Sequence, residues 1–242
     1  MRNYKEEMEG RVAFIRRLVK DSGVSGIVYG NSGGKDCALV SILCKAACKN
    51  TLGLIMPCAS RRNYEQDLRD AMAVAEAFGI ENRVLDLTPV QEAELQALAG
   101  VTEPSRDAVI NIAPRLRMTS LYAVAASENR LVAGTGNRSE RHMGYFTKWG
   151  DGACDFNPIA DLTAGEVLEF LAFLDAPRCV IDKAPSAGLY EGQTDEQDMG
   201  VSYRAIDKYL LTGQVNPEDK AIIDRFHSRS EHKRRPIPTY SE

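Results

Sequence analysis

The chain has 242 residues, of which 44% are hydrophobic and 26% charged, enough to bury the core of a globular domain. Thirty Lys and Arg against 34 Asp and Glu leave a net charge of −4, so no overall positive charge favours a nucleic-acid duplex or an anionic membrane. No apolar run approaches the roughly 18 residues of a membrane span, and the first twenty residues lack a secretory signal. We expect one domain over residues 1–242, in the cytoplasm, that binds neither nucleic acid nor membrane.

The spacing of the cysteines argues against a structural metal site. The six cysteines form no C-x-x-C pair and have no His at zinc-finger spacing. We expect six free thiols, most of which pack as small apolar side chains.

Strand and helix signals alternate along the chain. The first helix signal is amphipathic and places Met8, Val12, Ile15 and Val19 on one face, toward the core or a partner. Strands are predicted at 26–30, 52–56, 84–87 and 130–134, and further helices at 37–47, 67–78 and 116–126. Repeated strand–helix units predict an α/β fold, a doubly wound and mainly parallel sheet with helices on both faces. Ligands of such folds bind beyond the carboxyl ends of the strands.

The last third of the chain contains two long polar segments, at 151–163 and 182–197. Loops of this length usually bind something, and a plain surface excursion is the alternative.

One segment leaves a predicted strand and opens a predicted helix; it reads Gly30-Asn31-Ser32-Gly33-Gly34-Lys35-Asp36-Cys37. The paired glycines lack Cβ atoms that would keep a phosphate away, and their amides can point inward at the positive end of the helix. A polyphosphate would repel Asp36 unless a cation lay between them, so we interpret Asp36 as a Mg²⁺ ligand. The spacing fits neither the Walker motif nor the G-x-G-x-x-G fingerprint. A plain strand-to-helix turn, with Asp36 favouring the helix dipole, is the alternative interpretation.

Residues 32–37 resemble the S-G-G-x-D-S loop of the ATP pyrophosphatases, which cleave ATP between its α and β phosphates. Later segments resemble one family of that group, NAD synthetase, in the same order along the chain; they are 111–118, 134–140, 144–152, 183–189, 192–196 and 200–203. The resemblance runs from about residue 10 to the tail at 232–238.

The resemblance implies a reaction in which ammonia amidates the nicotinate carboxylate of deamido-NAD. ATP and Mg²⁺ drive it through an adenylated intermediate, with release of pyrophosphate and AMP. Free ammonia is the expected nitrogen source, because 242 residues leave no room for the amidase domain of glutamine-dependent forms. The resemblance also implies a homodimer with the deamido-NAD site at the subunit interface.

The roles of individual residues follow from the same resemblance. Residues Gly30 to Cys37 would hold the ATP phosphates, with further ATP contacts from Thr135 and Ser186. Asp36 and Glu140 would hold Mg²⁺. The deamido-NAD site would contain Arg115, Lys148, Asp155, His232 and Lys233. Asp36, Asp151 and Lys148 are the expected catalytic group, with Asp151 orienting ammonia.

Without the resemblance, each of these residues has an ordinary interpretation. Arg115 would be a solvated helix charge, Glu140 and Asp155 would be plain loop carboxylates, and Thr135 would cap a turn. Lys148 would stack on the neighbouring tryptophan, and the basic run at 232–235 would be a solvated tail.

Two positions depart from the family pattern. Cys37 replaces the usual Ser and offers a weaker donor to phosphate. Ala164 stands where many members have a Lys that contacts phosphate, which leaves Lys35 and Lys183 as candidate replacement cations.

Two other functions remain open from the sequence. One is another adenylating amidotransferase or thiolase of the same fold, although paired catalytic cysteines or a basic RNA-binding domain are absent. The other is a nucleotide-binding homologue that has lost the chemistry, which would bind ATP without releasing pyrophosphate.

Overall fold

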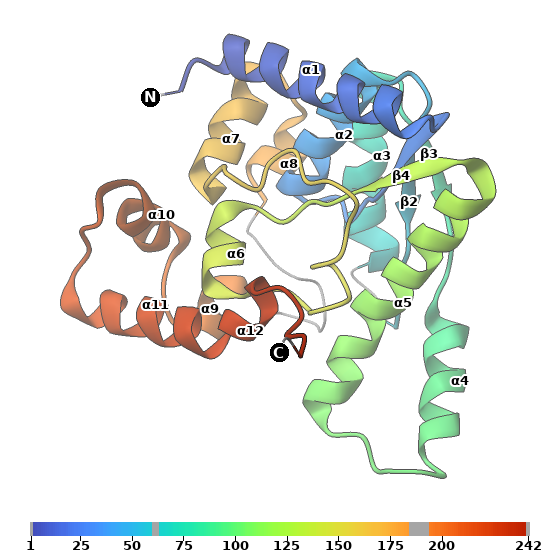
Figure 1. Cartoon of the computed structure of the whole chain (residues 1–242), viewed down its shortest axis with the longest axis vertical. Helices are drawn as coiled ribbons and strands as arrows, with labels where there is room; N and C mark the ends of the chain where they lie inside the picture. Colours follow the sequence, from blue (N-terminus) through green and yellow to red (C-terminus); the bar gives the residue numbers. More distant parts are fainter. Residues whose placement is uncertain (1, 60–62, 184–193, 241–242) are drawn as a thin grey trace.

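The computed structural model describes residues 2–59, 63–183 and 194–240 and contains a four-stranded parallel sheet between layers of helices (Figure 1). The strands are β1 (Gly26–Gly30), β2 (Thr51–Ile55), β3 (Glu81–Val84) and β4 (Arg130–Ala133). Their order is β3-β2-β1-β4. The chain therefore winds outward from β1 to β3 and returns to the other side of β1. This confirms the predicted doubly wound α/β class and places the reversal of strand order between β1 and β4.

Strand β3 corrects one sequence prediction. The apolar run at 84–87 predicts a strand there, but the strand begins earlier, at the polar residues Glu81 and Asn82, and ends at Val84. An edge strand needs no continuous apolar run, and Glu81, Arg83 and Val84 are exposed. Leu87, which the apolar pattern places in a strand, is buried just before the next helix.

The two faces of the sheet carry separate cores. Ile27 and Tyr29 of β1 pack with α1 (Tyr4–Ser22), α2 (Lys35–Ala47), α3 (Leu68–Phe78), α7 (Ala164–Phe173) and α8 (Arg178–Ile181). Val28 points to the opposite face, where it packs with Leu52, Leu54 and α5 (Arg106–Glu128). Helix α4 (Thr88–Leu98) lies against α5 (Figure 1). Alternation along β1 thus fills both cores, as expected for a sheet covered on both sides.

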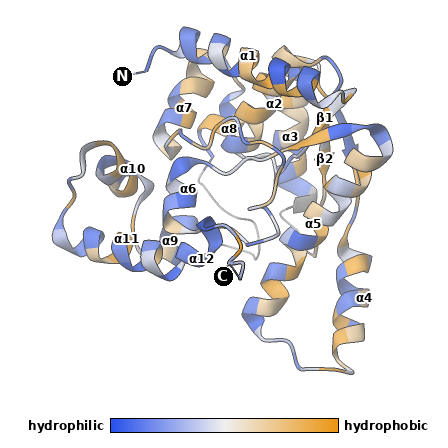
Figure 2. Cartoon of the chain, in the orientation of Figure 1, coloured by the Kyte–Doolittle hydropathy of each residue, from blue (hydrophilic) through white to orange (hydrophobic). Residues whose placement is uncertain are grey.

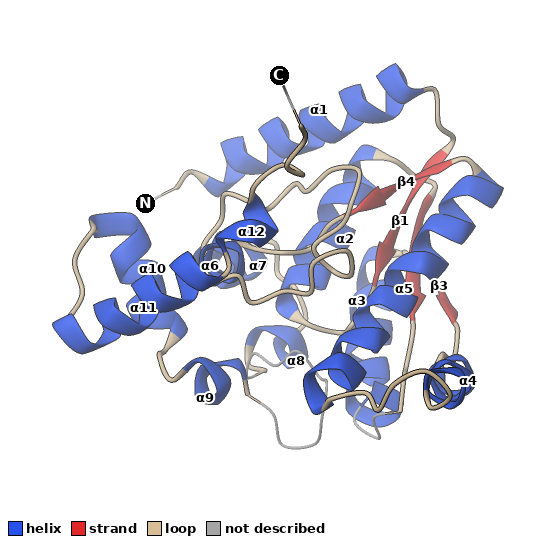
Figure 3. Cartoon of the chain, turned by 60° about the horizontal axis from the view of Figure 1, so that its bottom comes forward, coloured by secondary structure: helices blue, strands red, loops and turns tan. Residues whose placement is uncertain are grey.

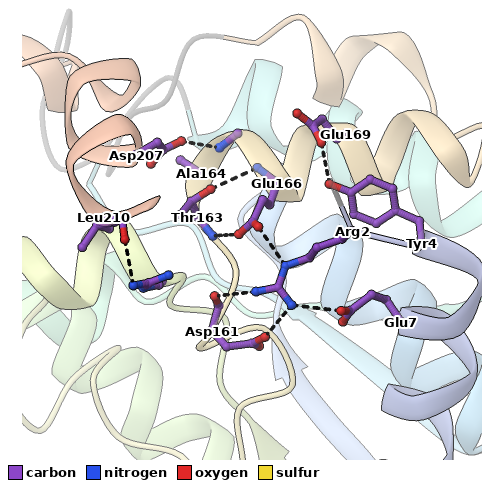
Figure 4. Close-up of polar contacts among 12 residues, drawn as sticks. Arg2, Tyr4, Glu7, Asp161, Thr163, Ala164, Glu166, Glu169, Asp207 and Leu210 are labelled. Carbon is purple, nitrogen blue, oxygen red and sulfur yellow. Dashed lines mark hydrogen bonds and ion pairs between the residues drawn. The ribbon is translucent and has the colours of Figure 1, made fainter. Parts of the chain in front are cut away.

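Helix α1 confirms the predicted amphipathic helix, and its apolar stripe faces the core. Val12 and Ile15 are buried against the sheet layer. Polar contacts attach the start of this helix to α7, because Arg2 pairs with Glu166 at 2.8 Å and the Tyr4 hydroxyl donates to Glu169 at 2.6 Å (Figure 4).

Helix α5 is longer than its predicted core at 116–126. It starts at Arg106, where the Ser105 hydroxyl accepts a hydrogen bond from the Ala108 amide, and it continues past Pro114. The proline and the polar residues of the first turns interrupt the apolar periodicity, so the sequence pattern does not predict this half of the helix. The extension matters because it carries side chains into the cavity described below.

The C-terminal part forms a third apolar cluster beside the sheet. It comprises residues of α6 (Arg138–Met143), α9 (Asp195–Met199), α10 (Tyr203–Thr212), α11 (Pro217–Arg229) and the start of α7, and Met143, Ile206 and Ile223 are its buried centre. Helix α12 (Glu231–Arg234) follows α11. Apolar residues concentrate around the sheet, whereas α11 and α12 are mainly hydrophilic (Figure 2). None of the helices in the described ranges is both long and apolar enough to cross a membrane. All six cysteines are free thiols, as expected.

Candidate active site

A cavity of about 920 Å³ opens beyond the carboxyl ends of β1, β2 and β4. Figure 3 shows the strands of the sheet side by side, with β4 and β3 at its two edges. The cavity lies at the reversal of strand order, where doubly wound folds bind their ligands. Most of the expected phosphate, metal and catalytic residues line it; these are Gly30, Asn31, Ser32, Gly34, Lys35, Asp36, Cys37, Thr135, Glu140 and Asp151. Gly33 and Lys148 are not among the residues that line it. Ser186 lies outside the described residues.

The loop after β1 has the backbone geometry of an anion site. Gly33 adopts a φ of +68°, a left-handed conformation that glycine tolerates best. Helix α2 begins directly after Gly34, and no side chain caps its first turn. The N-terminal amides of a helix are normally satisfied by a cap, by water or by a ligand. An uncapped helix start that faces the cavity therefore suits a phosphate.

Cys37 lies at the base of this loop as a protonated thiol. Its Sγ lies 3.2 Å from the Ser32 Oγ, and burial raises the pKa of the thiol above its usual range. A nucleophilic cysteine needs a lowered pKa, so this environment favours packing and weak hydrogen bonding over covalent catalysis.

Asn137 connects the two carboxylates that the sequence assigns to Mg²⁺. Its side-chain amide donates to Asp36 Oδ1 at 3.0 Å, and its backbone amide donates to Glu140 Oε2 at 2.9 Å. The same residue caps α6 through a hydrogen bond from the Glu140 amide to its Oδ1. The capping box thus fixes Glu140 next to a carboxylate 104 positions earlier in the chain.

The electrostatics of this pair call for a cation. Burial raises the pKa of Glu140 well above its usual value, and the Asp36 charge raises it further. The described ranges hold no cluster of three or more His, Cys, Asp or Glu residues that could bind a metal alone. Mg²⁺ commonly uses one or two carboxylates and completes its shell with substrate phosphates and water. Asp36 and Glu140 beside an anion-binding loop fit that mode of binding.

Lys35 supplies one fixed positive charge at this place. Its Nζ lies 2.5 Å from Asp36 Oδ2 and 5.6 Å from the centre of the Tyr203 ring. Burial alone would lower the pKa of Lys35, but the carboxylates of Asp36 and Glu140 outweigh burial and raise it. The side chain therefore remains an ammonium inside the cavity.

The residues assigned to deamido-NAD lie mostly around the cavity and not in its wall. Lys148 Nζ donates to the His232 carbonyl at 2.8 Å and lies 5.3 Å from the Trp149 ring. Asp155 accepts hydrogen bonds from the Val132 amide at 2.7 Å and from the Tyr122 hydroxyl at 3.1 Å. Arg115 and His232 are exposed.

Lys233 is the exception, because it reaches the cavity. Its Nζ donates to the carbonyls of Gly144 at 2.8 Å and Phe146 at 2.6 Å. Burial lowers the pKa of Lys233. Lys148 and Lys233 together fasten the 144–152 segment to α12.

Asp151 lies in the cavity wall, where the Thr147 amide donates to its Oδ1 at 2.9 Å. Sequence reasoning overlooked its neighbour Arg117, whose Nε donates to the Met56 carbonyl at 3.0 Å while the side chain lines the cavity. Arg115 and Arg117 lie on one helix, two residues apart, and residues two apart point in different directions. A projection of residues 106–128 onto a helix would have shown that the two arginines point in different directions.

Ala164 lies away from solvent in the third apolar cluster. Its amide donates to Ser139 Oγ at 3.1 Å, and the next amide, of Gly165, donates to Asp207 at 2.7 Å. The position therefore contributes backbone contacts at the start of α7 and no charge.

Comparison with known proteins agrees with this geometry. The sequence profile described as NAD synthase matches residues 7–237. The chain belongs to the NAD synthase family. It is 46% identical to the NH3-dependent NAD(+) synthetase of Carboxydothermus hydrogenoformans over 236 residues, which cover 96% of each chain. The four-stranded parallel sheet flanked by helices matches the fold of a solved member of this family of ligases.

Two solved structures match this NAD synthase family member over the whole of both chains. The NMN synthetase of Francisella tularensis superposes with a TM-score of 0.94 at 38% identity. The NH3-dependent NAD synthetase of Campylobacter jejuni, crystallised with a nitrate ion, gives a TM-score of 0.80 at 29% identity.

The phosphate loop, residues 30–37, contains two adjacent glycines at which alanine should have different effects. A Cβ at Gly33 would overlap the Asp67 carbonyl and occupy a left-handed backbone, whereas a Cβ at Gly34 would meet only the Ser32 hydroxyl, at 3.3 Å. We expect Gly33→Ala to lower the free energy of unfolding by about 2 kcal/mol or more, and Gly34→Ala by about 1 kcal/mol or less. Urea unfolding without nucleotide measures both, and equal losses in the two variants would contradict the loop geometry.

Proposed function

We propose that the chain is an ammonia-dependent NAD synthetase that amidates deamido-NAD with ATP and Mg²⁺. The observation that carries this proposal is the contact of Asn137 with both Asp36 and Glu140, at the mouth of an uncapped helix in this family's fold. It brings an anion site and a divalent-cation site into one cavity, as the binding of a nucleoside triphosphate requires.

The chemistry proceeds in two steps. A carboxylate is a poor electrophile, so a nicotinate oxygen first attacks the α-phosphorus of ATP, and the bond to the pyrophosphate oxygen breaks. Ammonia then attacks the carbonyl carbon of the acyl adenylate, loses a proton and displaces AMP. Neither step needs a covalent enzyme nucleophile, which agrees with the raised pKa of the Cys37 thiol.

The chain's own residues perform positioning and charge neutralisation. The loop from Gly30 to Cys37 and the first amides of α2 hold the phosphates, with Thr135 and Ser186 as further ATP contacts. Asp36 and Glu140 hold Mg²⁺, which would neutralise charge on the departing pyrophosphate. Aligning reactants and stabilising such charge can account for most of the rate enhancement in phosphoryl and nucleotidyl transfer.

Asp151 has the position needed to orient ammonia. It lines the cavity, and the Thr147 amide fixes one of its oxygens, which leaves the other as a possible acceptor for an ammonia N–H. Lys148 acts from the rim, where it holds α12 and the 144–152 segment in place. The proposal keeps Asp36, Asp151 and Lys148 as the catalytic group.

We also propose that two copies of the chain complete the dinucleotide site. Arg115, Asp155 and His232 are exposed and lie outside the cavity wall of a single chain. Exposed apolar residues lie on or next to β3, α4 and α5; they include Val84, Leu85, Val90 and Tyr122. Tyr122 donates to Asp155, so this apolar face adjoins the proposed substrate residues.

A homodimer that covered this face would place Arg115 and Asp155 at its interface. Analytical ultracentrifugation is expected to give the mass of two chains. A monomer that retained full activity at the same concentration would contradict the shared site.

A second candidate substrate is nicotinic acid mononucleotide, on which the same amidation would yield NMN. The observation in its favour is the closer structural match to the NMN synthetase, with a TM-score of 0.94 against 0.80 for the NAD synthetase. Both substrates would react through the same nicotinate carboxylate and with ATP in the same site. The two substrates differ only in the adenylate half, which the rim residues would contact.

The decisive experiment incubates the purified chain with ATP, Mg²⁺, ammonium and deamido-NAD, omitting each in turn. We expect NAD, AMP and pyrophosphate in equal amounts, and only in the complete mixture. ATP binding without pyrophosphate release would indicate a non-catalytic homologue instead. A parallel series with nicotinic acid mononucleotide compares kcat/KM, and a preference of tenfold or more identifies the physiological substrate class.

A further inference from the structure

Next to the phosphate loop, Lys183 joins three segments that are distant in sequence. Its Nζ donates to Asp70 Oδ2 at 2.6 Å, to Asp67 Oδ1 at 2.9 Å and to the Gly33 carbonyl at 3.2 Å. Asp67 ends the short π-helix η1 (Asn63–Asp67), Asp70 lies in the first turn of α3, and Gly33 belongs to the loop after β1. The ammonium therefore acts as a crosslink between the loop after β1, η1 and α3.

The contacts of Lys183 account for its whole hydrogen-bonding capacity. A lysine ammonium has three N–H donors, and the structure gives it three acceptors. Two of these acceptors are carboxylates, so the ammonium is already paired with negative charge. All three of its N–H donors are in use, and none is left for a phosphate oxygen. Lys183 therefore does not supply the cation that position 164 lacks, although its side chain reaches the cavity wall.

The contact with Gly33 has a consequence for the other side of the same peptide. In a planar trans peptide, the carbonyl and the following N–H point in opposite directions. Lys183 holds the Gly33 carbonyl on one side of this peptide and thereby fixes the Gly34 N–H on the opposite side, and Gly34 lines the cavity. That amide donates to Ser32 Oγ through a long hydrogen bond of 3.3 Å, which a phosphate oxygen could replace.

Lys183 can hold the Gly33 carbonyl only while the loop after β1 stays packed against η1. Gly33 packs so closely on the Asp67 carbonyl that a Cβ would overlap it. Asp70 in turn accepts a hydrogen bond from Gln66 at 2.8 Å, and only 3% of its side chain is exposed. The hydrogen bond from Gln66 thus holds the Asp70 carboxylate in place. Asp70 and Asp67 in turn hold the ammonium of Lys183.

We propose that Lys183, held by Asp67 and Asp70, is a positioning residue that sets the Gly33–Gly34 peptide for the phosphates of ATP. The role rests on the proposed function only in that ATP is the ligand of this loop. It differs from a direct phosphate contact, in which the ammonium would leave the carboxylates and bind the nucleotide.

Three variants distinguish these roles by calorimetric titration with Mg-ATP, well below the unfolding temperature. Lys183→Met removes the crosslink, and Asp70→Asn weakens it while leaving the ammonium in place. Both are expected to raise the Kd of Mg-ATP about tenfold, which corresponds to about 1.4 kcal/mol. Arg178→Met is the matched control, since it removes an exposed cation of α8 that lies 3.9 Å from Asp182, and it should change the Kd less than twofold.

Asp70→Asn decides between the two roles even if Lys183→Met does not fold. An unchanged or lower Kd would mean that the released ammonium binds phosphate directly, and would overturn the proposal. Equal Kd values for Lys183→Met and the wild-type chain would overturn it as well. Failure of the wild-type chain to bind Mg-ATP would instead contradict the proposed function, so the two failures are distinguishable.

Discussion

The hydrogen bond between Asn137 and Asp36 connects the two halves of the active site. Asp36 lies in the first turn of α2, which follows β1, and Glu140 lies in α6, which follows β4. The sheet order makes β1 and β4 neighbours although about a hundred residues separate them. The side-chain amide of Asn137 donates to Asp36 and its backbone amide to Glu140, so one residue holds both carboxylates at the start of α2.

Lys35 places an ammonium against Asp36, whereas burial, and then the charge of Asp36, raises the pKa of Glu140. In the proposed function, a divalent cation bound with a polyphosphate would offset the remaining negative charge. The lysines of the cavity have different contacts: Lys35 pairs with Asp36, whereas Lys183 pairs with Asp67 and Asp70.

Sequence reasoning predicted the elements whose signal is local. The buried strands β1, β2 and β4 have continuous apolar runs, and the glycine loop has a composition that only a close backbone approach explains. Strand β3 was displaced by three residues because an edge strand lacks that apolar signal, and α5 was shortened because Pro114 interrupts its periodicity.

The site was predictable only in part, for a related reason. Motif order identified Asp36, Glu140 and Asp151, and the structure gathers them in one cavity. The crosslink of Lys183 to Asp67 and Asp70 depends on how η1 and α3 dock against the loop, which no spacing in the sequence reveals. The proposed roles of Arg115 and Asp155 at a subunit interface stay predictions.

The most direct test of the account follows the carboxylate oxygen of the substrate. If the nicotinate attacks the α-phosphorus, deamido-NAD labelled with oxygen-18 in its carboxylate transfers one labelled oxygen to AMP, and mass spectrometry of AMP detects it. We expect one labelled oxygen per AMP formed and none in pyrophosphate. Unlabelled AMP formed together with NAD, or label in pyrophosphate, would contradict the acyl adenylate and the alignment of reactants on which this account depends.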